Sequence, residues 1–145
     1  MEKVKDMLEI MFEMQEALNN TVGRPIAPWK KGINKEDDTA LLKAGEMLDD
    51  LIKATSSELE ELRDCTYWKH WQKEAKEGKR YQIHNLKEAK KEVIDLLHFF
   101  ISMALWTGMD AEEMYKLYVE KNKINFKRQE DDYSYKDKGM HDKGE

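Results

Sequence analysis

The sequence contains little cysteine, proline or glycine. Its only cysteine is Cys65, so the chain can form no intramolecular disulfide and cannot build a zinc site from thiolates alone. This cysteine usage fits a reducing compartment such as the cytoplasm. The 2 prolines and 7 glycines disfavour the turn-rich β-sandwiches and barrels. With 38% charged residues and 9 methionines, the composition is typical of a helical protein.

The chain also lacks a basic excess and a long apolar run. Its 30 acidic residues outnumber its 25 basic ones and give a net charge of −5, which disfavours non-specific binding to nucleic-acid phosphates. The longest apolar stretch, 93–106, is interrupted by Asp95 and His98 and is shorter than the roughly 20 residues that cross a bilayer. Residues 1–6 contain no apolar signal segment. We therefore expect a cytoplasmic protein with neither a nucleic-acid nor a membrane partner.

A length of 145 residues predicts a single domain. We place that domain at 1–133, because the sequence after it becomes rich in Asp, Lys and Gly, and we expect 134–145 to be a flexible polar tail. Within the domain, apolar residues recur at spacings of three and four, and no segment alternates as a strand does. The pattern predicts an all-α domain, a bundle of four to five helices.

Capping residues and glycines divide this domain into its helices. Ser56 or Ser57 could cap a new turn, so the second helical stretch is either one bent helix or two. Asn85 is expected to cap the next long helix. The predicted elements are a helix over about 2–19, a loop over 19–35, a helix starting at 37–39, a helix over 86–107 that ends before Gly108, and a last helix running through Met114 and Ile124.

Two pairs of carboxylates have the spacing that places side chains on one face of a helix. Glu58 and Glu61 are three residues apart, as are Glu92 and Asp95. If the two helices are antiparallel neighbours, the four carboxylates converge, and a hard cation such as Mg²⁺ or Mn²⁺ would offset their repulsion. In a chain this acidic, the pairs could instead lie on solvated faces. Glu92 could also form a salt bridge with Lys87, Lys90 or Lys91.

Asp95 and His98 lie in the most apolar stretch of the chain. The surrounding V-I-D-L-L-H-F-F predicts a helix that is apolar almost all round, so Asp95 is expected to be buried and to need a partner or a metal. The D-x-x-H spacing also occurs in di-iron sites of the ferritin type, but these need a matching E-x-x-H motif, which the chain lacks. We expect His98 to be a core histidine hydrogen-bonded to a neighbour.

An aromatic block with a basic residue at its centre follows the first carboxylate pair. It reads Tyr67-Trp68-Lys69-His70-Trp71. An aromatic platform beside a cation suits a base stacked above a phosphate. The same aromatic side chains could instead fill a core.

The last predicted helix gathers amides and cations. Asn122, Asn125 and Arg128 share one face, and Lys121 lies beside them. Amides can read base edges and arginine can bind phosphate in a bidentate manner, whereas a basic helix end that complements the helix dipole is the alternative. Because the sequence contains no glycine-rich phosphate loop, phosphates would be held by a metal and by side chains.

In this order the motifs resemble those of the all-α dimeric dUTP diphosphatases, which belong with the MazG-like nucleotide pyrophosphohydrolases. The resemblance covers about residues 8–133. The aromatic block placed after E-x-x-E, together with the later K-N-x-x-N-x-x-R, is its most specific part. The matching stretches are M-Q-E-A-L-N at 14–19, E-L-E-E-L-R-D at 58–64, Y-W-K-H-W at 67–71, E-V-I-D-L-L-H-F at 92–99 and Y-V-E-K-N-K-I-N-F-K-R-Q at 118–129.

The resemblance implies a homodimer that hydrolyses dUTP to dUMP and pyrophosphate with Mg²⁺, for which Mn²⁺ could substitute, and it leaves dUDP open as a second substrate. Glu58, Glu61, Glu92 and Asp95 would hold the metal ions, and Glu58 or Glu61, with Glu58 preferred, would orient the attacking water. The implied phosphate ligands are Lys69, Lys121 and Arg128. The implied base and sugar contacts are Gln15, Asn19, Trp29, His70, Trp71, Phe99, Asn122 and Asn125.

Two other functions stay open on the sequence. A pyrophosphohydrolase that prefers dCTP or another nucleoside triphosphate would need the same carboxylates and phosphate ligands, because the motifs specify the phosphate chemistry better than the base. A non-catalytic helical interaction module could keep the fold without the chemistry. These alternatives differ in whether the protein releases pyrophosphate at all and from which nucleotide.

Overall fold

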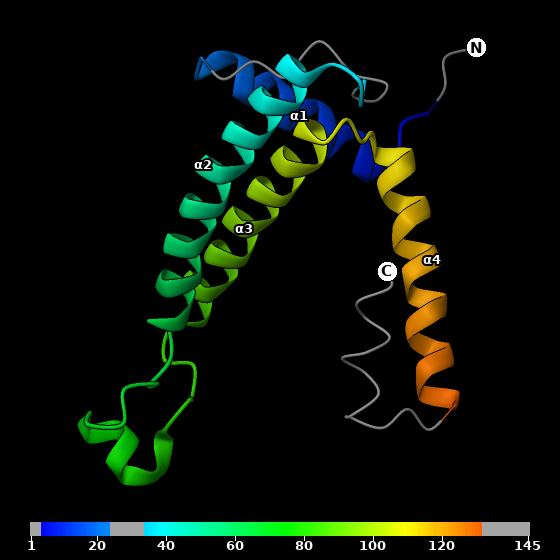
Figure 1. Ribbon diagram of the computed structural model, residues 1–145. Helices are drawn as coiled ribbons and strands as arrows, with labels where there is room; N and C mark the ends of the chain where they lie inside the picture. Colours follow the sequence, from blue (N-terminus) through cyan, green and yellow to red (C-terminus); the bar gives the residue numbers. More distant parts are fainter. Residues whose placement is uncertain (1–3, 24–33, 132–145) are drawn as a thin grey trace. The chain divides into compact units, whose positions relative to one another are not determined.

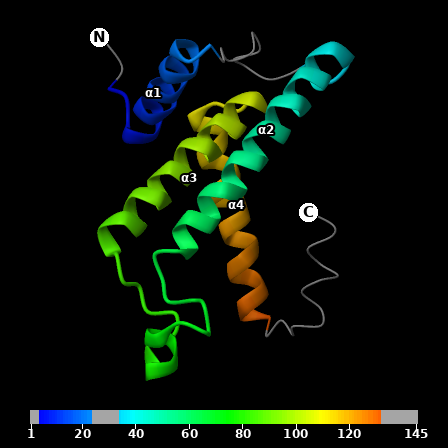
Figure 2. The same ribbon diagram turned by 90° about the vertical axis from the view of Figure 1, so that its left-hand side faces the viewer.

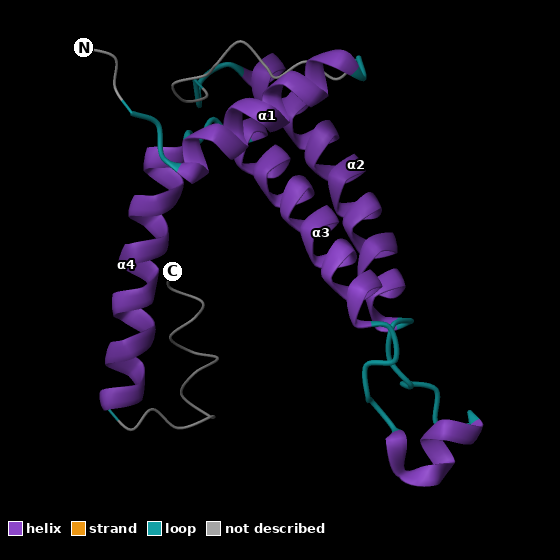
Figure 3. Cartoon of the chain, turned by 180° about the vertical axis from the view of Figure 1, so that it is seen from behind, coloured by secondary structure: helices purple, strands orange, loops and turns teal. Residues whose placement is uncertain are grey.

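The computed structural model describes residues 4–23 and 34–131 (Figure 1). Within these ranges the chain is helical and contains no strand, apart from one isolated bridge between Thr66 and Ile83 (Figure 3). The predicted all-α fold is therefore confirmed. Trp29 and the predicted tail lie outside the described residues. The helices are α1 (Met7–Thr21), α2 (Asp38–Arg63), a short π-helical turn η1 (Ala75–Lys79), α3 (Leu86–Trp106) and α4 (Ala111–Glu130).

Polar caps begin three of these helices. Oδ1 of Asp37 accepts a hydrogen bond from the Ala40 amide at 3.1 Å, and Oδ1 of Asn85 accepts one from the Glu88 amide at 3.1 Å. Both starts agree with the sequence, because a side-chain oxygen satisfies an amide that has no partner in the first turn. The first helix begins later than predicted, since Asp6 caps it and α1 starts at Met7.

The second helical stretch is one helix. Neither Ser56 nor Ser57 starts a new turn, and the Ser56 hydroxyl instead donates to the carbonyl of Ile52 at 3.0 Å within α2. A serine that donates back to the preceding turn leaves the helix intact. α3 ends at Trp106, and Gly108 adopts a φ of 82°, the left-handed conformation that glycine tolerates best.

The chain divides into two compact units, Met1–Asp110 and Ala111–Glu145, which are described separately. In the first unit α2 and α3 run antiparallel side by side, and α1 packs against α3 near the start of α2 (Figure 1, Figure 2). The buried core at this end consists of Ala44, Met47, Leu51 and Trp106, with Phe99 and Met103 packed against it. In the second unit α4 is amphipathic only weakly, and its exposed apolar residues are Tyr115, Leu117, Tyr118, Ile124 and Phe126. A single domain over 1–133 stays a prediction.

The first unit leaves much apolar surface open. Met14 is 64% exposed, Ile52 is 54% exposed and Phe100 is 49% exposed. Among the described residues no large side chain is completely buried. A layer of three helices has too little interior to cover the apolar residues it carries. No single described helix is long and apolar enough to cross a membrane, and only α3 and α4 taken together across their break reach that length and hydropathy.

Candidate functional site

Three of the four predicted metal ligands meet between α2 and α3. Glu58 and Glu61 lie one turn apart near the end of α2, and Glu92 lies near the start of α3. One carboxylate oxygen from each lies within 4.8 Å of the others. The two helices are antiparallel neighbours, which is the condition under which the sequence predicted that the carboxylates converge. We call Glu58, Glu61 and Glu92 the acidic cluster.

The acidic cluster contains buried oxygens that no group in the chain satisfies. Glu92 is only 6% exposed. Its Oε2 atom and the Oε2 atom of Glu58 are both buried without a hydrogen-bond partner. Leaving buried carboxylate oxygens unpaired is costly, and hard divalent cations prefer such all-oxygen sets. The residues present therefore fit the divalent metal that the sequence implied.

The crowding of like charges shifts the acidities within the cluster. Hydrogen bonding to Glu58, burial and the neighbouring Glu88 raise the pKa of Glu92 to about 8. The contact with Glu58 likewise raises the pKa of Glu61, and repulsion from Asp95 adds to the increase. The alternative salt bridge from Glu92 to a lysine is wrong among the described residues, since Lys91 lies 3.9 Å from Glu88 instead.

Asp95 does not behave as the sequence predicted. It is exposed, whereas Glu92 is the buried carboxylate of α3, and Val93 and Ile94 are half exposed. The expectation of a helix buried almost all round is wrong because, within the described part of the first unit, the helices that pack against α3 are α1 and α2, and they cover part of its circumference. Asp95 stands outside the acidic cluster, although it is near enough to raise the pKa of Glu61. Its role as a fourth metal ligand stays a prediction.

A cavity of about 420 Å³ opens where α1 meets α2 and α3. It brings together three of the predicted base contacts, Gln15 and Asn19 of α1 and Phe99 of α3. The sequence alone did not assign the other lining residues to a site, because most of them are apolar residues whose spacing indicates only a core. These are Leu18, Val22, Met47, Leu51, His98, Ser102 and Trp106.

A chain of hydrogen bonds runs along the wall of this cavity. His98 Nδ1 bonds to Gln15 Oε1, Gln15 Nε2 donates to Asn19 Oδ1 at 2.8 Å, and Asn19 Nδ2 donates to Ser102 Oγ at 3.3 Å. His98 is thus hydrogen-bonded as predicted, but it is exposed and is not a core histidine. The sequence contains a signal for one of these links, since Gln15 and Asn19 are an i, i+4 pair, and the same spacing places His98 and Ser102 on one face of α3.

The cavity and the acidic cluster lie along the same face of α2. Met47, Leu51, Thr55 and Glu58 follow one another at helical spacing, and the first two line the cavity. Because a helix rises about 1.5 Å per residue, the cluster lies roughly 10 Å from Leu51. A ligand whose polar head enters the cavity could therefore extend an anionic tail to the carboxylates.

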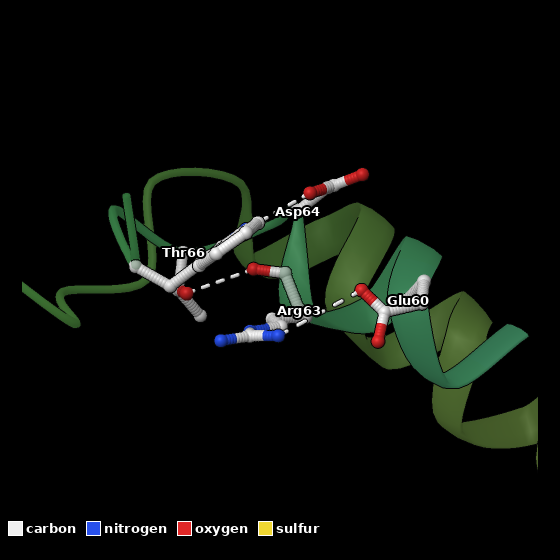
Figure 4. A network of polar contacts seen from close by, with 5 residues as sticks. Glu60, Arg63, Asp64 and Thr66 are labelled. Carbon is white, nitrogen blue, oxygen red and sulfur yellow. Dashed lines mark hydrogen bonds and ion pairs between the residues drawn. The ribbon is translucent and has the colours of Figure 1, made fainter. Parts of the chain in front are cut away.

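The aromatic block follows the C-terminal end of α2, the end that carries Glu58 and Glu61, and it does not line the cavity (Figure 1). The Trp68 indole donates to Oδ1 of Asp64 at 2.9 Å, and the Arg63 guanidinium lies 3.7 Å from its ring centroid. The Arg63 guanidinium also lies 3.9 Å from the Glu60 carboxylate, and the Thr66 hydroxyl donates to the Arg63 carbonyl at 2.8 Å (Figure 4).

Neither predicted base contact of this block reaches the cavity in the structure. His70 packs edge-on against Trp71, and both are exposed, so these two side chains do not fill a core, whereas Tyr67 and Trp68 are partly buried. Lys69 is partly buried beside Trp68, with its ammonium 5.8 Å from the ring centroid. The roles of these residues in nucleotide binding stay predictions.

The remaining predicted contacts lie on α4, in the second unit. Asn122 and Asn125 are exposed, and Arg128 is partly buried. The spacing that places them on one face is present, since α4 is helical from Ala111 to Glu130. Their contribution to a site, and that of Lys121, stays a prediction.

Comparison with known proteins gives the family. A family model described as dUTPase matches residues 7–110. The dCTP pyrophosphatase of Enterobacteria phage LZ5 is 34% identical over 148 residues, which cover 88% of this chain and 83% of the relative. The dCTP pyrophosphatase of Enterobacteria phage T4 is 29% identical over 143 residues, which cover 89% of this chain and 84% of the relative. A DNA replication protein of phage T4 is 28% identical over 133 residues, which cover 82% of this chain but 34% of that protein. No solved structure matches significantly.

The chain therefore belongs to the dUTPase family, the all-α family that its motifs resemble. The match spans α1, α2 and α3, and so includes both the acidic cluster and the cavity. Membership supports a nucleoside triphosphate pyrophosphohydrolase activity.

Proposed function

We propose that this protein is a Mg²⁺-dependent pyrophosphohydrolase of pyrimidine deoxynucleoside triphosphates, which cleaves dUTP or dCTP to the monophosphate and pyrophosphate. The observation that carries the proposal is the pair of buried, unsatisfied oxygens on Glu58 and Glu92, beside a cavity with a polar wall. The family description supports dUTP, and the names of the two phage pyrophosphatases support dCTP.

In the proposed site, the acidic cluster and Asp95 hold the divalent cations. When bound, Mg²⁺ supplies a Lewis acid that neutralises phosphate charge and lowers the pKa of water, and Mn²⁺ would substitute. With its Oε2 atom on a cation, Glu58 would use its other carboxylate oxygen to orient the attacking water and to accept its proton. The water oxygen bonds to phosphorus, and the phosphoanhydride bond between the α- and β-phosphates breaks to release pyrophosphate.

The cavity is the proposed place of the base. Phe99 offers an apolar face there, while Gln15 and Asn19 offer amide donors and acceptors. The cations Lys69, Lys121 and Arg128 are proposed to neutralise phosphate charge, and Asn122 and Asn125 to contact the sugar or base. Trp29, His70 and Trp71 complete the proposed nucleotide contacts.

Pyrophosphate release from a panel of nucleotides tests this function. We expect release from dUTP, dCTP or both in the presence of Mg²⁺, and none with excess chelator, because the carboxylates cannot position the phosphates without a cation. Purine nucleotides should be poor substrates, and dUDP included in the panel shows whether a diphosphate suffices. If no nucleotide of the panel yields pyrophosphate with Mg²⁺ or with Mn²⁺, a non-catalytic interaction module would be favoured.

We further propose that the protein is a homodimer. The exposed apolar side chains of the first unit, among them Met14, Ile52 and Phe100, are the kind of surface that a second copy covers. Sedimentation equilibrium over a dilution series should show a species of twice the 17.2 kDa chain mass at micromolar concentration. A monomer at every concentration would contradict this proposal.

A further inference from the structure

The hydrogen-bonded chain along the cavity wall has two ends of different character. Ser102, at one end, is only 3% exposed. His98, at the other end, is exposed and can exchange partners with solvent. Between them stand the amides of Gln15 and Asn19, both buried.

Each of the three links can run in either direction. In the orientation that the structure shows, His98 donates to Gln15, Gln15 donates to Asn19, and Asn19 donates to Ser102. A hydroxyl and a neutral imidazole can each serve as donor or acceptor. If both amides turn over, Ser102 donates to Asn19, Asn19 to Gln15, and Gln15 to His98, with no hydrogen bond lost.

Turning an amide over exchanges what it offers to the cavity. In each direction the amide nitrogens of Gln15 and Asn19 keep one further hydrogen, and their oxygens keep a further lone pair. Uracil presents an N–H at position 3 and an acceptor oxygen at position 4, whereas cytosine presents an acceptor nitrogen and an amino group. One amide orientation complements uracil and the reversed orientation complements cytosine.

We propose that Ser102 is a positioning residue that sets the direction of this chain and thereby the preference of the cavity between uracil and cytosine. Its hydroxyl accepts or donates, so the native chain is reversible, and both pyrimidines can be bound. His98 adapts by changing which ring nitrogen carries the proton. The inference rests on the proposed function, because it assigns the base to this cavity.

Two variants are expected to fix the donor-to-acceptor direction of these hydrogen bonds in opposite senses. Ser102→Ala removes the buried end, and Asn19 should then turn its oxygen toward residue 102, because an orphaned buried N–H is tolerated less well than an orphaned carbonyl. Asn19→Asp can only accept, so Gln15 must donate to it and turn its oxygen toward His98. Ser102→Thr keeps the hydroxyl and is the matched control.

The measurement is the ratio of kcat/KM for dUTP to that for dCTP. We expect Ser102→Ala and Asn19→Asp to shift this ratio in opposite directions, each by about tenfold and mainly through KM, whereas Ser102→Thr keeps the wild-type ratio. A purely structural role would lower both activities equally and leave the ratio unchanged.

Equal losses on both substrates, or shifts of the ratio in the same direction, would overturn the inference. A wild-type protein that releases pyrophosphate from neither nucleotide would instead refute the proposed function, and the inference would fall with it. Circular dichroism of each variant separates a changed ratio from a changed fold.

Discussion

Replacing Glu92 with glutamine is expected to lower Mg²⁺-dependent pyrophosphate release by about a hundredfold or more. Loss of a residue that merely supports a metal ligand already costs about 10–100-fold, and Glu92 is placed to bind the cation directly. Glutamine keeps the volume of the side chain in its buried position but cannot supply the negative charge that a carboxylate carries when it binds a cation. Steady-state release of pyrophosphate at saturating nucleotide, together with far-ultraviolet circular dichroism, measures the effect.

Glu60→Gln is the matched control for this variant. Glu60 is on the same helix between the two cluster residues of α2, but it points to Arg63, at 3.9 Å, and stands outside the acidic cluster (Figure 4). Replacing Glu60 removes an exposed ion pair, and such a pair contributes little to the free energy of unfolding. The control should therefore keep near wild-type turnover. Similar activities for Glu92→Gln and Glu60→Gln would show that the cluster does not hold the catalytic metal.

In the presence of a chelator, the wild-type protein is expected to lose stability as the pH rises from 5 to 8. The pKa of Glu92 is about 8 in the folded chain against an ordinary value of 4.5, so in this window the folded state keeps a proton that the unfolded state releases. Stability falls with rising pH wherever the unfolded state binds fewer protons. The raised pKa of Glu61 acts in the same direction.

The Glu92→Gln variant isolates this effect from the other titrating groups. Glutamine is neutral at every pH, as the protonated Glu92 is, so wild type and variant should melt at similar temperatures at pH 5. At pH 8 without metal the variant should melt higher. Added Mg²⁺ should raise the melting temperature of the wild type at pH 8 and leave the variant nearly unchanged. A difference in melting temperature that stays the same at both pH values would contradict the assigned charge state.

The helices themselves followed from local signals in the sequence. Asp37 and Asn85 begin α2 and α3 where they were expected, since a cap acts on amides of its own turn. The possible helix start at Ser56 or Ser57 is absent, because the same hydroxyl that can cap a helix can also donate to the carbonyl of the preceding turn. Only the surrounding turns decide between these two uses.

The pairing of Glu58 with Glu61 was predictable because its signal is also local. The three-residue spacing of Glu58 and Glu61 places them on one face, and the structure adds only that Glu92 meets them. The prediction failed for the burial of Asp95, because burial depends on which side of α3 other helices cover. The sequence of α3 is apolar on several sides and does not reveal which one faces its partners.

Periodicity and capping, read within a few turns of helix, were enough for the sequence by itself to determine most of the helices. Carboxylate spacing placed Glu58 and Glu61 on one face of α2, and the resemblance of the motifs indicated the family. Two of the three hydrogen bonds along the cavity wall were decided only by tertiary structure. Gln15 and Asn19 stand 83 residues from the His98 and Ser102 side chains that they bond, so their pairing exists only once α1 packs against α3. A buried amide takes its partner from whatever the packing brings within hydrogen-bond distance, and no local pattern encodes that choice.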